Sequence, residues 1–140
     1  MHLYGILETA LYGNNLNELA DFYKSVFGFN EVARTEGRNV VLSCSTSALI
    51  LFNPDVSIKK DGKFPYHGTA GPGHIAFLIK DEEQGKWREH LKNHKINIEK
   101  EINWEDGSTS IYLRDPADNS VELAPATLWN NLGRKMLSIE

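Results

Sequence analysis

The sequence predicts an α+β protein built from two copies of a strand–helix–three-strand (βαβββ) module. Three observations predict it: the same order of strand-like and helix-like segments occurs twice, a long turn-rich connection separates the copies, and the helical segments are amphipathic. A chain of 140 residues has the usual size of one domain, whereas about half that length would not bury its apolar face alone. We therefore expect a single domain over 1–140 that consists of two modules.

The first module is expected over about residues 5–53. It begins with a strand at 6–12, where β-forming residues alternate before the turn-prone Gly13. From residue 15 the apolar side chains recur at intervals of three and four, which predicts an amphipathic helix that ends at Gly28. Three strands are predicted after the helix, at 30–35, 39–44 and 48–52.

A long connection is expected at 54–73, where prolines and glycines surround a charged run at 59–63. Connections of this length in a compact chain are usually functional or mobile, or they link modules. The second module, over about 74–126, repeats the first, with a strand at 74–79, a helix at 82–94 and strands at 96–102, 109–114 and 119–124. A short amphipathic helix over about 127–138 is expected to cover its own domain.

Alternation along the strands assigns side chains to the two faces of the sheet. One face is apolar and suits packing beneath the helices: Thr9, Leu11, Leu49, Leu51, Ile75, Phe77, Ile79, Ile111, Leu113, Val121 and Leu123. The other face combines small residues with polar and ionisable ones: Glu8, Ala10, Tyr12, Ala48, Ile50, His74, Ala76, Ser110, Tyr112, Arg114, Ser120 and Glu122. This second composition suits a concave, partly hydrated pocket.

Glu8, His74 and Glu122 occupy three of the four positions that the repeat makes equivalent on the polar face, and Ile50 occupies the fourth. Carboxylate and imidazole groups are common ligands of iron, manganese, cobalt, nickel and zinc ions. A cation would also offset the cost, on the order of several kcal/mol, of gathering two carboxylates in a cavity. The pattern therefore favours a metal site.

Each of these residues also has a purely structural explanation. Glu8 would face solvent from an edge strand, His74 would be a hydrogen-bonded core histidine, and Glu122 would pair with Arg114 or Arg88. What favours the metal interpretation is that all three residues fall at repeat-related positions on one face.

Composition limits the classes of partner. With 15 basic and 19 acidic residues the formal charge is −4 and the pI about 5.7, so a general attraction to nucleic acid or anionic membrane is not expected. The single cysteine, Cys44, cannot form an intrachain disulfide and lies on the apolar side of its strand with Val40 and Leu42, which disfavours a reactive thiol. Without a signal-peptide pattern or a run of about 18 to 20 apolar residues, we expect a cytoplasmic protein with small-molecule or protein partners.

Three segments, LETALYGNNLNELADFYKSVFGF, GPGHIAF and YLRDPADNSVELA, together with the duplication resemble the vicinal oxygen chelate superfamily. This group includes glyoxalase I, extradiol dioxygenases, fosfomycin-resistance thiol transferases, methylmalonyl-CoA epimerase and bleomycin-resistance proteins. The resemblance covers nearly the whole chain, and Asp-Pro-x-x-Asn-x-x-Glu at 115–122 is its most specific part. It implies that the modules form a curved sheet around a cleft, that a metal lies at the floor of the cleft, and that the protein is a homodimer.

The resemblance places the metal ligands at Glu8, His74 and Glu122. The family's first ligand is commonly histidine, so Glu8 is a departure, and Ile50 stands where glyoxalase I has a fourth ligand. A Glu-His-Glu set is harder than one with two histidines, which favours manganese or iron(II) over zinc, nickel or cobalt. The metal would chelate two vicinal oxygens of a small oxygenated substrate.

Further roles are assigned on the same basis. Tyr112 and His67 are the candidates for acid–base or substrate-orienting work, although Tyr112 would equally serve as a pocket wall and His67 as a solvated loop residue. The candidates for substrate binding are Arg114, Ser110 and Tyr12. An ion pair with Asp115 or Glu122 would explain the presence of Arg114 equally well. The turn at 115–119 is expected to shape the strand that carries Glu122.

The leading functional hypothesis is a metal-dependent enzyme with lyase, isomerase or dioxygenase chemistry. The alternative is a metal-free protein of the bleomycin-resistance type that sequesters a small molecule or drug. Ile50 disfavours glyoxalase I proper, and the two-module length disfavours the larger extradiol enzymes. Fosfomycin-type thiol transfer is disfavoured because few basic residues are candidates for the anion: Arg114, Lys59, Lys60 and Lys63.

Overall fold

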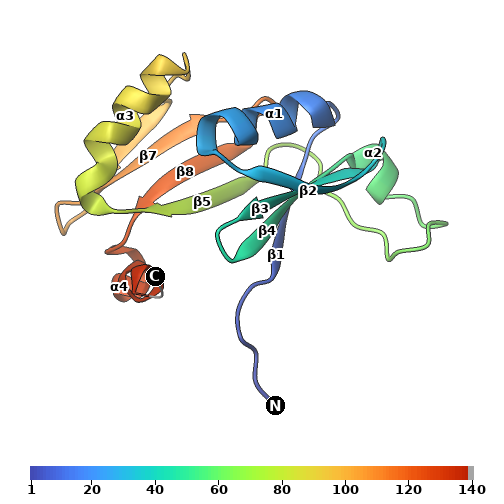
Figure 1. Cartoon of the computed structure of the whole chain (residues 1–140), viewed down its shortest axis with the longest axis horizontal. Helices are drawn as coiled ribbons and strands as arrows, with labels where there is room; N and C mark the ends of the chain where they lie inside the picture. Colours follow the sequence, from blue (N-terminus) through green and yellow to red (C-terminus); the bar gives the residue numbers. More distant parts are fainter. Residues whose placement is uncertain (139–140) are drawn as a thin grey trace. The chain divides into compact units, whose positions relative to one another are not determined.

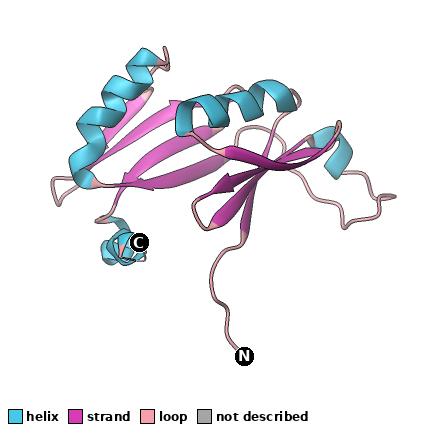
Figure 2. Cartoon of the chain, in the orientation of Figure 1, coloured by secondary structure: helices cyan, strands magenta, loops and turns pink. Residues whose placement is uncertain are grey.

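The computed structural model describes residues 1–138, which form two compact units (Figure 1). The first unit comprises Met1–Gly73 and the turn Asp115–Asn119, and the second comprises His74–Arg114 and the chain from Ser120 onward. Each unit contains one four-stranded sheet together with helices (Figure 2). The α+β fold with two βαβββ modules and a C-terminal helix is therefore confirmed.

The first sheet has the strand order β1-β4-β3-β2, in which β1 and β4 run parallel and the other pairs antiparallel. Its elements are β1 (Glu8–Tyr12), α1 (Leu16–Phe27), β2 (Asn30–Thr35), β3 (Asn39–Cys44) and β4 (Ser47–Phe52). A short helix, α2 (Pro54–Ser57), follows β4 inside the connection that the sequence predicts as irregular.

Helix α1 packs on one face of the first sheet (Figure 1). The side chain of Asn15 accepts the N–H of Glu18 at 3.2 Å and caps the start, and Gly28 ends the helix with a left-handed φ of 71°. Its buried residues are Leu16, Leu19, Ala20, Phe22, Tyr23 and Val26. Burial of a large apolar side chain contributes roughly 1.5–3 kcal/mol, so this stripe fixes α1 and leaves the polar side chains of β1 and β4 on the opposite face.

The second sheet repeats the first, with the order β5-β8-β7-β6 and a parallel β5–β8 pair. Its elements are β5 (His74–Ile79), η1 (Asp81–Glu83), α3 (Gln84–Asn93), β6 (Lys100–Asn103), β7 (Thr109–Arg114), β8 (Ser120–Pro125) and α4 (Leu128–Leu137). Leu91 of α3 is fully buried, as are the apolar residues Ile111, Leu113, Val121 and Leu123. These residues form the core of the second unit.

Strand register shows that the two modules are equivalent residue by residue. In the first sheet Ala10, the third residue of β1, pairs with Ile50; in the second Ala76, the third residue of β5, pairs with Glu122. The predicted equivalence of Ile50 and Glu122 is therefore present in the hydrogen-bonding pattern itself.

Two expectations about packing differ from the structure. Most of the predicted apolar face is buried, but Thr9 is exposed, because it lies on the edge strand β1 of its sheet. The C-terminal helix does not bury its large apolar side chains: Trp129 and Met136 are 80% and 56% exposed. Only Gly133 of α4 is buried. None of the helices within residues 1–138 is long and apolar enough to cross a membrane.

Candidate functional site

His74 and Glu122 lie side by side on the polar face of the second sheet. His74 opens β5 and Glu122 is on β8, which pairs with β5 so that His74 is opposite Ser120 and Ala76 is opposite Glu122. Diagonal neighbours of this kind are within reach of long side chains. The distance from Nε2 of His74 to Oε2 of Glu122 is 3.4 Å. The structure therefore brings these two residues together, and their role as metal ligands stays a prediction.

Ser120 orients the imidazole of His74. Both the hydroxyl and the carbonyl oxygen of Ser120 lie 3.2 Å from Nδ1 of His74. An Nδ1–H that donates to these oxygens leaves the lone pair on Nε2, the atom that faces Glu122. Histidines that ligate metals are commonly held in this way, with the second ring nitrogen bonded to a carbonyl or hydroxyl group.

Glu122 is a buried carboxylate with one unpartnered oxygen. The residue is 6% exposed, and Oε1 has no hydrogen-bond partner among the described residues. Leaving a charged acceptor buried without a partner costs on the order of 1–3 kcal/mol or more. Because acids at such positions are normally paired, this oxygen marks a place where a cation or a donor group would be bound.

Tyr112 stands next to this pair, since β7 and β8 place it directly opposite Glu122. Its ring lies parallel to that of His74, with 6.4 Å between the centroids. Burial, and then the neighbouring Glu122 carboxylate, raise the pKa of Tyr112. The phenol therefore keeps its proton at neutral pH and is a hydrogen-bond donor on the ligand face.

Ser110 and Arg114, the other candidates on β7, are engaged in contacts of their own. Ser110 is fully buried, and its hydroxyl oxygen accepts the indole N–H of Trp104 at 2.9 Å. Arg114 donates from Nε and Nη2 to the two carboxylate oxygens of Glu99, at 2.7 and 3.0 Å. The pairing of Arg114 that the sequence suggested, with Asp115 or Glu122, is replaced by this one with Glu99.

The other proposed partner of Glu122 is also committed elsewhere. Arg88 forms a two-bond ion pair with Glu101, with an Nε–Oε1 distance of 2.8 Å. Within residues 1–138, Arg88 and Arg114 each pair with another glutamate, and the structure does not show Glu122 in an ion pair with either of them.

Glu8, the third predicted ligand, belongs to the first unit, where it opens β1 and is exposed. It pairs in register with Ala48, as His74 does with Ser120 in the second sheet. Within residues 1–138 no three His, Cys, Asp or Glu side chains form a group suited to a metal ion. The three-ligand set thus stays a prediction, of which the structure brings two members together.

Tyr12 and His67, predicted separately, form a contact in the first unit. The phenol oxygen of Tyr12 is 2.7 Å from Nδ1 of His67. Both rings pack on Phe52, with centroid distances of 6.0 Å for Tyr12 and 4.5 Å for His67. The backbone N–H of His67 also donates to the carbonyl of Ser57 at 3.0 Å. His67 is therefore half-buried and held by these contacts within the connection, and its part in catalysis stays a prediction.

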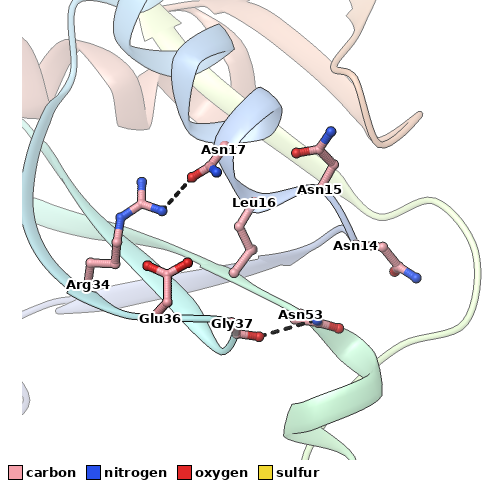
Figure 3. Close-up of a pocket in the computed structure, with 8 residues that line it drawn as sticks. All are labelled: Asn14, Asn15, Leu16, Asn17, Arg34, Glu36, Gly37 and Asn53. Atoms are coloured by element: carbon pink, nitrogen blue, oxygen red, sulfur yellow. Dashed lines mark hydrogen bonds between the residues drawn. The ribbon is translucent and has the colours of Figure 1, made fainter.

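Two cavities are present in the first unit. One of about 560 Å³ is lined by Tyr12, the start of α1, the connection after β4 and the turn at 116–118. The other, of about 380 Å³, is shown in Figure 3 and contains Arg34 and four asparagines. There Arg34 donates to Asn17 at 2.6 Å and Asn53 donates to the carbonyl of Gly37, so its polar groups already hold the local backbone together.

The turn Asp115–Asn119 contributes a buried polar network that sequence reasoning did not anticipate. Tyr23 of α1 donates its hydroxyl to Oδ2 of Asp115 at 2.8 Å, and Asn119 donates to the same oxygen and to the carbonyl of Tyr12. Asp118 adopts the left-handed φ of 65°, as the turn chemistry predicts. The only sequence signal for this network was the Asp-Pro-x-x-Asn spacing, which indicates a turn but not its partners.

These features together define a duplicated βαβββ protein with a histidine–carboxylate pair on the polar face of its second sheet. The model of the Glyoxalase/Bleomycin resistance protein/Dioxygenase superfamily matches residues 5–123, and the chain belongs to that superfamily. The resemblance predicted from sequence is thereby confirmed.

Solved structures agree with the family assignment. The chain is 38% identical to a lactoylglutathione lyase from Agrobacterium tumefaciens, with a TM-score of 0.87 over 91% of this chain and 98% of that one. It shares the fold of a fosfomycin resistance protein from Listeria monocytogenes, with 22% identity and a TM-score of 0.69 over 94% of this chain and 100% of that one. A mutant of the Listeria protein, 21% identical to this chain, was crystallised with manganese(II) and 1S,2S-dihydroxypropylphosphonic acid; its TM-score is 0.69 over 96% of this chain and 99% of that one.

Proposed function

We propose that this protein is a metal-dependent enzyme that acts on a small oxygenated molecule bound through two oxygens to a divalent cation. One observation carries the proposal: Oε1 of the buried Glu122 carboxylate has no partner, and Nε2 of His74 lies 3.4 Å from the second oxygen of the same group. A cation at this position would give both oxygens and the imidazole lone pair a partner. The several kcal/mol that an unpaired buried carboxylate costs would then be removed.

The donor set fits such a cation. His74 and Glu122 offer one nitrogen and up to two oxygens. Ser120 orients the imidazole through its contacts with Nδ1, the ring nitrogen that would not bind the metal. Glu8 is proposed as the third ligand, contributed from the first unit of the same chain or of a second copy. Ile50, at the fourth equivalent position, has no donor atom, so three protein ligands leave positions for substrate. Manganese or iron(II) suits this carboxylate-rich set.

The chain's own residues would provide proton transfer and orientation. A divalent cation supplies Lewis-acid stabilisation of a developing oxyanion. Tyr112, with its raised pKa, holds a proton beside Glu122 and would donate a hydrogen bond to the substrate oxygen. Tyr12 and His67 would act as a second proton-handling pair on the polar face of the first sheet.

Lyase chemistry on a 2-oxoaldehyde and a thiol is the first reaction to test, because a lactoylglutathione lyase is 38% identical over 91% of this chain. Isomerase and dioxygenase reactions would be tested after it. A metal-free sequestering protein is the second candidate, supported by the 3.4 Å His74–Glu122 contact, because a proton on Nε2 of His74 would satisfy one carboxylate oxygen without a cation.

Metal analysis separates the two. Protein purified without chelator would be analysed for bound metals by mass spectrometry, alongside the variants His74→Ala, Glu122→Gln and Glu8→Gln and the control Glu89→Gln on the exposed face of α3. The proposal expects about one metal per chain in the wild type and control, and a large loss in the three variants. No stoichiometric metal, or equal metal content in every variant, would sink it.

Activity would then be measured with manganese(II) and iron(II) on methylglyoxal with several thiols, on catechols and on fosfomycin. Turnover that requires the metal and is lost in His74→Ala supports an enzyme. Saturable binding of a compound without turnover in metal-free protein supports sequestration instead.

A further inference from the structure

Arg38 is held between aromatic rings at the end of the first sheet. Its guanidinium carbon lies 5.9 Å from the centroid of Phe52 and 5.3 Å from that of Phe64. Phe52 is the ring on which Tyr12 and His67 also pack. Arg38, Phe52 and His67 therefore belong to one cluster at the Tyr12 end of the polar face, all within the first unit.

Arg38 differs from Arg34, Arg88 and Arg114 in having no carboxylate partner among residues 1–138. Arg34, Arg88 and Arg114 each form a two-bond pair with a glutamate: Glu31, Glu101 and Glu99. Arginine stacked on a ring keeps its N–H donors free around its edge, and those donors match a carboxylate or phosphonate in pairs. An unpaired guanidinium that is half-buried against rings attracts such a group more strongly than one in water.

Neighbouring side chains supply a further donor and more positive charge. Burial raises the pKa of Tyr12, so its hydroxyl keeps its proton; where this hydroxyl donates to Nδ1 of neutral His67, the ring hydrogen is on Nε2. In the same connection Lys63 lies over Phe64 and Lys60 over Tyr66, at 5.5 and 5.2 Å. The charged run at 59–63 holds three lysines and one aspartate, so it is net positive in a chain with net charge −4.

We propose that Arg38, Phe52, Phe64 and His67 form a binding site for the oxyanion of a small molecule, namely a carboxylate or phosphonate group. Arg38 would bind the anion through paired N–H donors, and the rings would hold the guanidinium in place and exclude water from it. The proposal rests on the proposed function only in taking this molecule as the substrate, because the anion contact needs no metal. The substrate would then be an oxygenated molecule with a separate anionic group.

The test is an NMR titration of metal-free protein in zwitterionic buffer at low salt. The probes are methylphosphonate, lactate and the neutral analogue lactamide, and the signals are Nε–H of Arg38 and Cε1–H of His67. Both anions should shift these signals and saturate, lactamide should not, and added salt should weaken the effect. Equal responses to lactate and lactamide, or no response of Arg38, would overturn the site.

Variants test the assignment to Arg38. Arg38→Gln should weaken anion binding roughly tenfold or more, as expected for loss of a charged hydrogen-bonding partner. Arg38→Lys keeps the charge but loses the paired donors, so its affinity for the anions should lie between those of the wild type and Arg38→Gln. Arg134→Gln, on the exposed side of α4, is the matched control and should bind like the wild type. Equal affinities for Arg38→Gln and Arg134→Gln would overturn the proposal; if Arg38→Gln does not fold, the wild-type titration and Arg38→Lys decide.

The outcome is independent of the metal measurement. If anions bind but no stoichiometric metal is found, the anion site stands and the proposed metal-dependent enzyme is wrong. If metal binds but Arg38 does not respond to anions, the metal-dependent enzyme stands and the anion site is wrong.

Discussion

Gly73 donates its backbone N–H to Oδ1 of Asn119 at 2.7 Å, and the amide nitrogen of the same side chain donates to the carbonyl of Tyr12 at 3.2 Å. One buried amide thus joins the end of β1, the residue before His74 and the residue before β8.

Asn119→Ala should lower the free energy of unfolding by about 2–4 kcal/mol, because it removes a buried amide and leaves the part-buried Gly73 N–H and Tyr12 carbonyl without this partner. Asn119→Asp should be at least as harmful, since it places a second carboxylate next to Asp115. Urea denaturation measures both. Asn93→Ala, at the exposed end of α3, is the control and should change little; a similar small effect for Asn119→Ala would contradict the assigned role.

Tyr23 should make stability fall at alkaline pH. Burial, and then the charge and hydrogen bond of Asp115, raise its pKa far above the ordinary value of 10.0. In the unfolded chain the phenol ionises above about pH 10, whereas in the folded chain it stays protonated. The unfolded state then binds fewer protons, so each pH unit above 10 lowers the unfolding free energy by about 1.4 kcal/mol.

Tyr23→Phe tests this sign. At neutral pH the variant should lose about 1.5–3 kcal/mol with the hydrogen bond to Asp115, and above pH 10 the gap to the wild type should narrow. Denaturation curves between pH 7 and 11 provide the measurement, with Tyr4→Phe at an exposed position as the control. A constant gap over that range would show that Tyr23 does not control the alkaline loss.

Gly133 and Gly85 should respond to alanine in opposite directions. A Cβ at Gly133 would lie 2.7 Å from a methyl group of Leu78 and 2.8 Å from the Cα of Ala126, whereas one at Gly85 would meet nothing within 4 Å. Gly133→Ala should therefore cost about 1–3 kcal/mol by overpacking, and Gly85→Ala in α3 should gain about 0.4–1 kcal/mol. Thermal unfolding of the two variants checks the signs; equal shifts would mean that α4 is not held at Gly133.

Added metal should stabilise the wild type but not Glu122→Gln. A ligand that binds only the folded state raises the unfolding free energy by about 2.7 kcal/mol at one hundred times its dissociation constant. Chelator-treated protein titrated with manganese(II) and followed by thermal unfolding gives the comparison. An equal rise in both proteins would place the ion elsewhere.

Strand and helix periodicity recovered most of the fold. The strands at 30–35, 39–44, 74–79 and 109–114 have the predicted bounds, because alternation and turn residues mark both ends. The strand expected at 96–102 forms only at Lys100–Asn103, since residues before Lys100 contribute one ladder bond, from Glu99 to Tyr112. Helix α2 was missed, although Asn53 and Pro54 carry the signals of a helix start.

The site was recovered in part. Repeat equivalence led to His74 and Glu122, whose approach follows from strand register. It did not lead to the Tyr12–His67 bond, because that contact depends on how a long connection folds back on the sheet. The contacts of Arg38 with Phe52 and Phe64 were missed for a similar reason, because one phenylalanine precedes α2 in the sequence and the other follows it.

The shared register of Ile50 and Glu122 bears on how the two halves have diverged. Both side chains are buried: Ile50 is 8% exposed and Glu122 is 6% exposed. The two halves therefore have a buried side chain at the same position, which is aliphatic in the first half and acidic in the second. A duplicated scaffold that keeps the acid in a single half can change the other without disturbing it. A substitution at position 50 can therefore change the first half at this position without altering the His74–Glu122 arrangement of the second half.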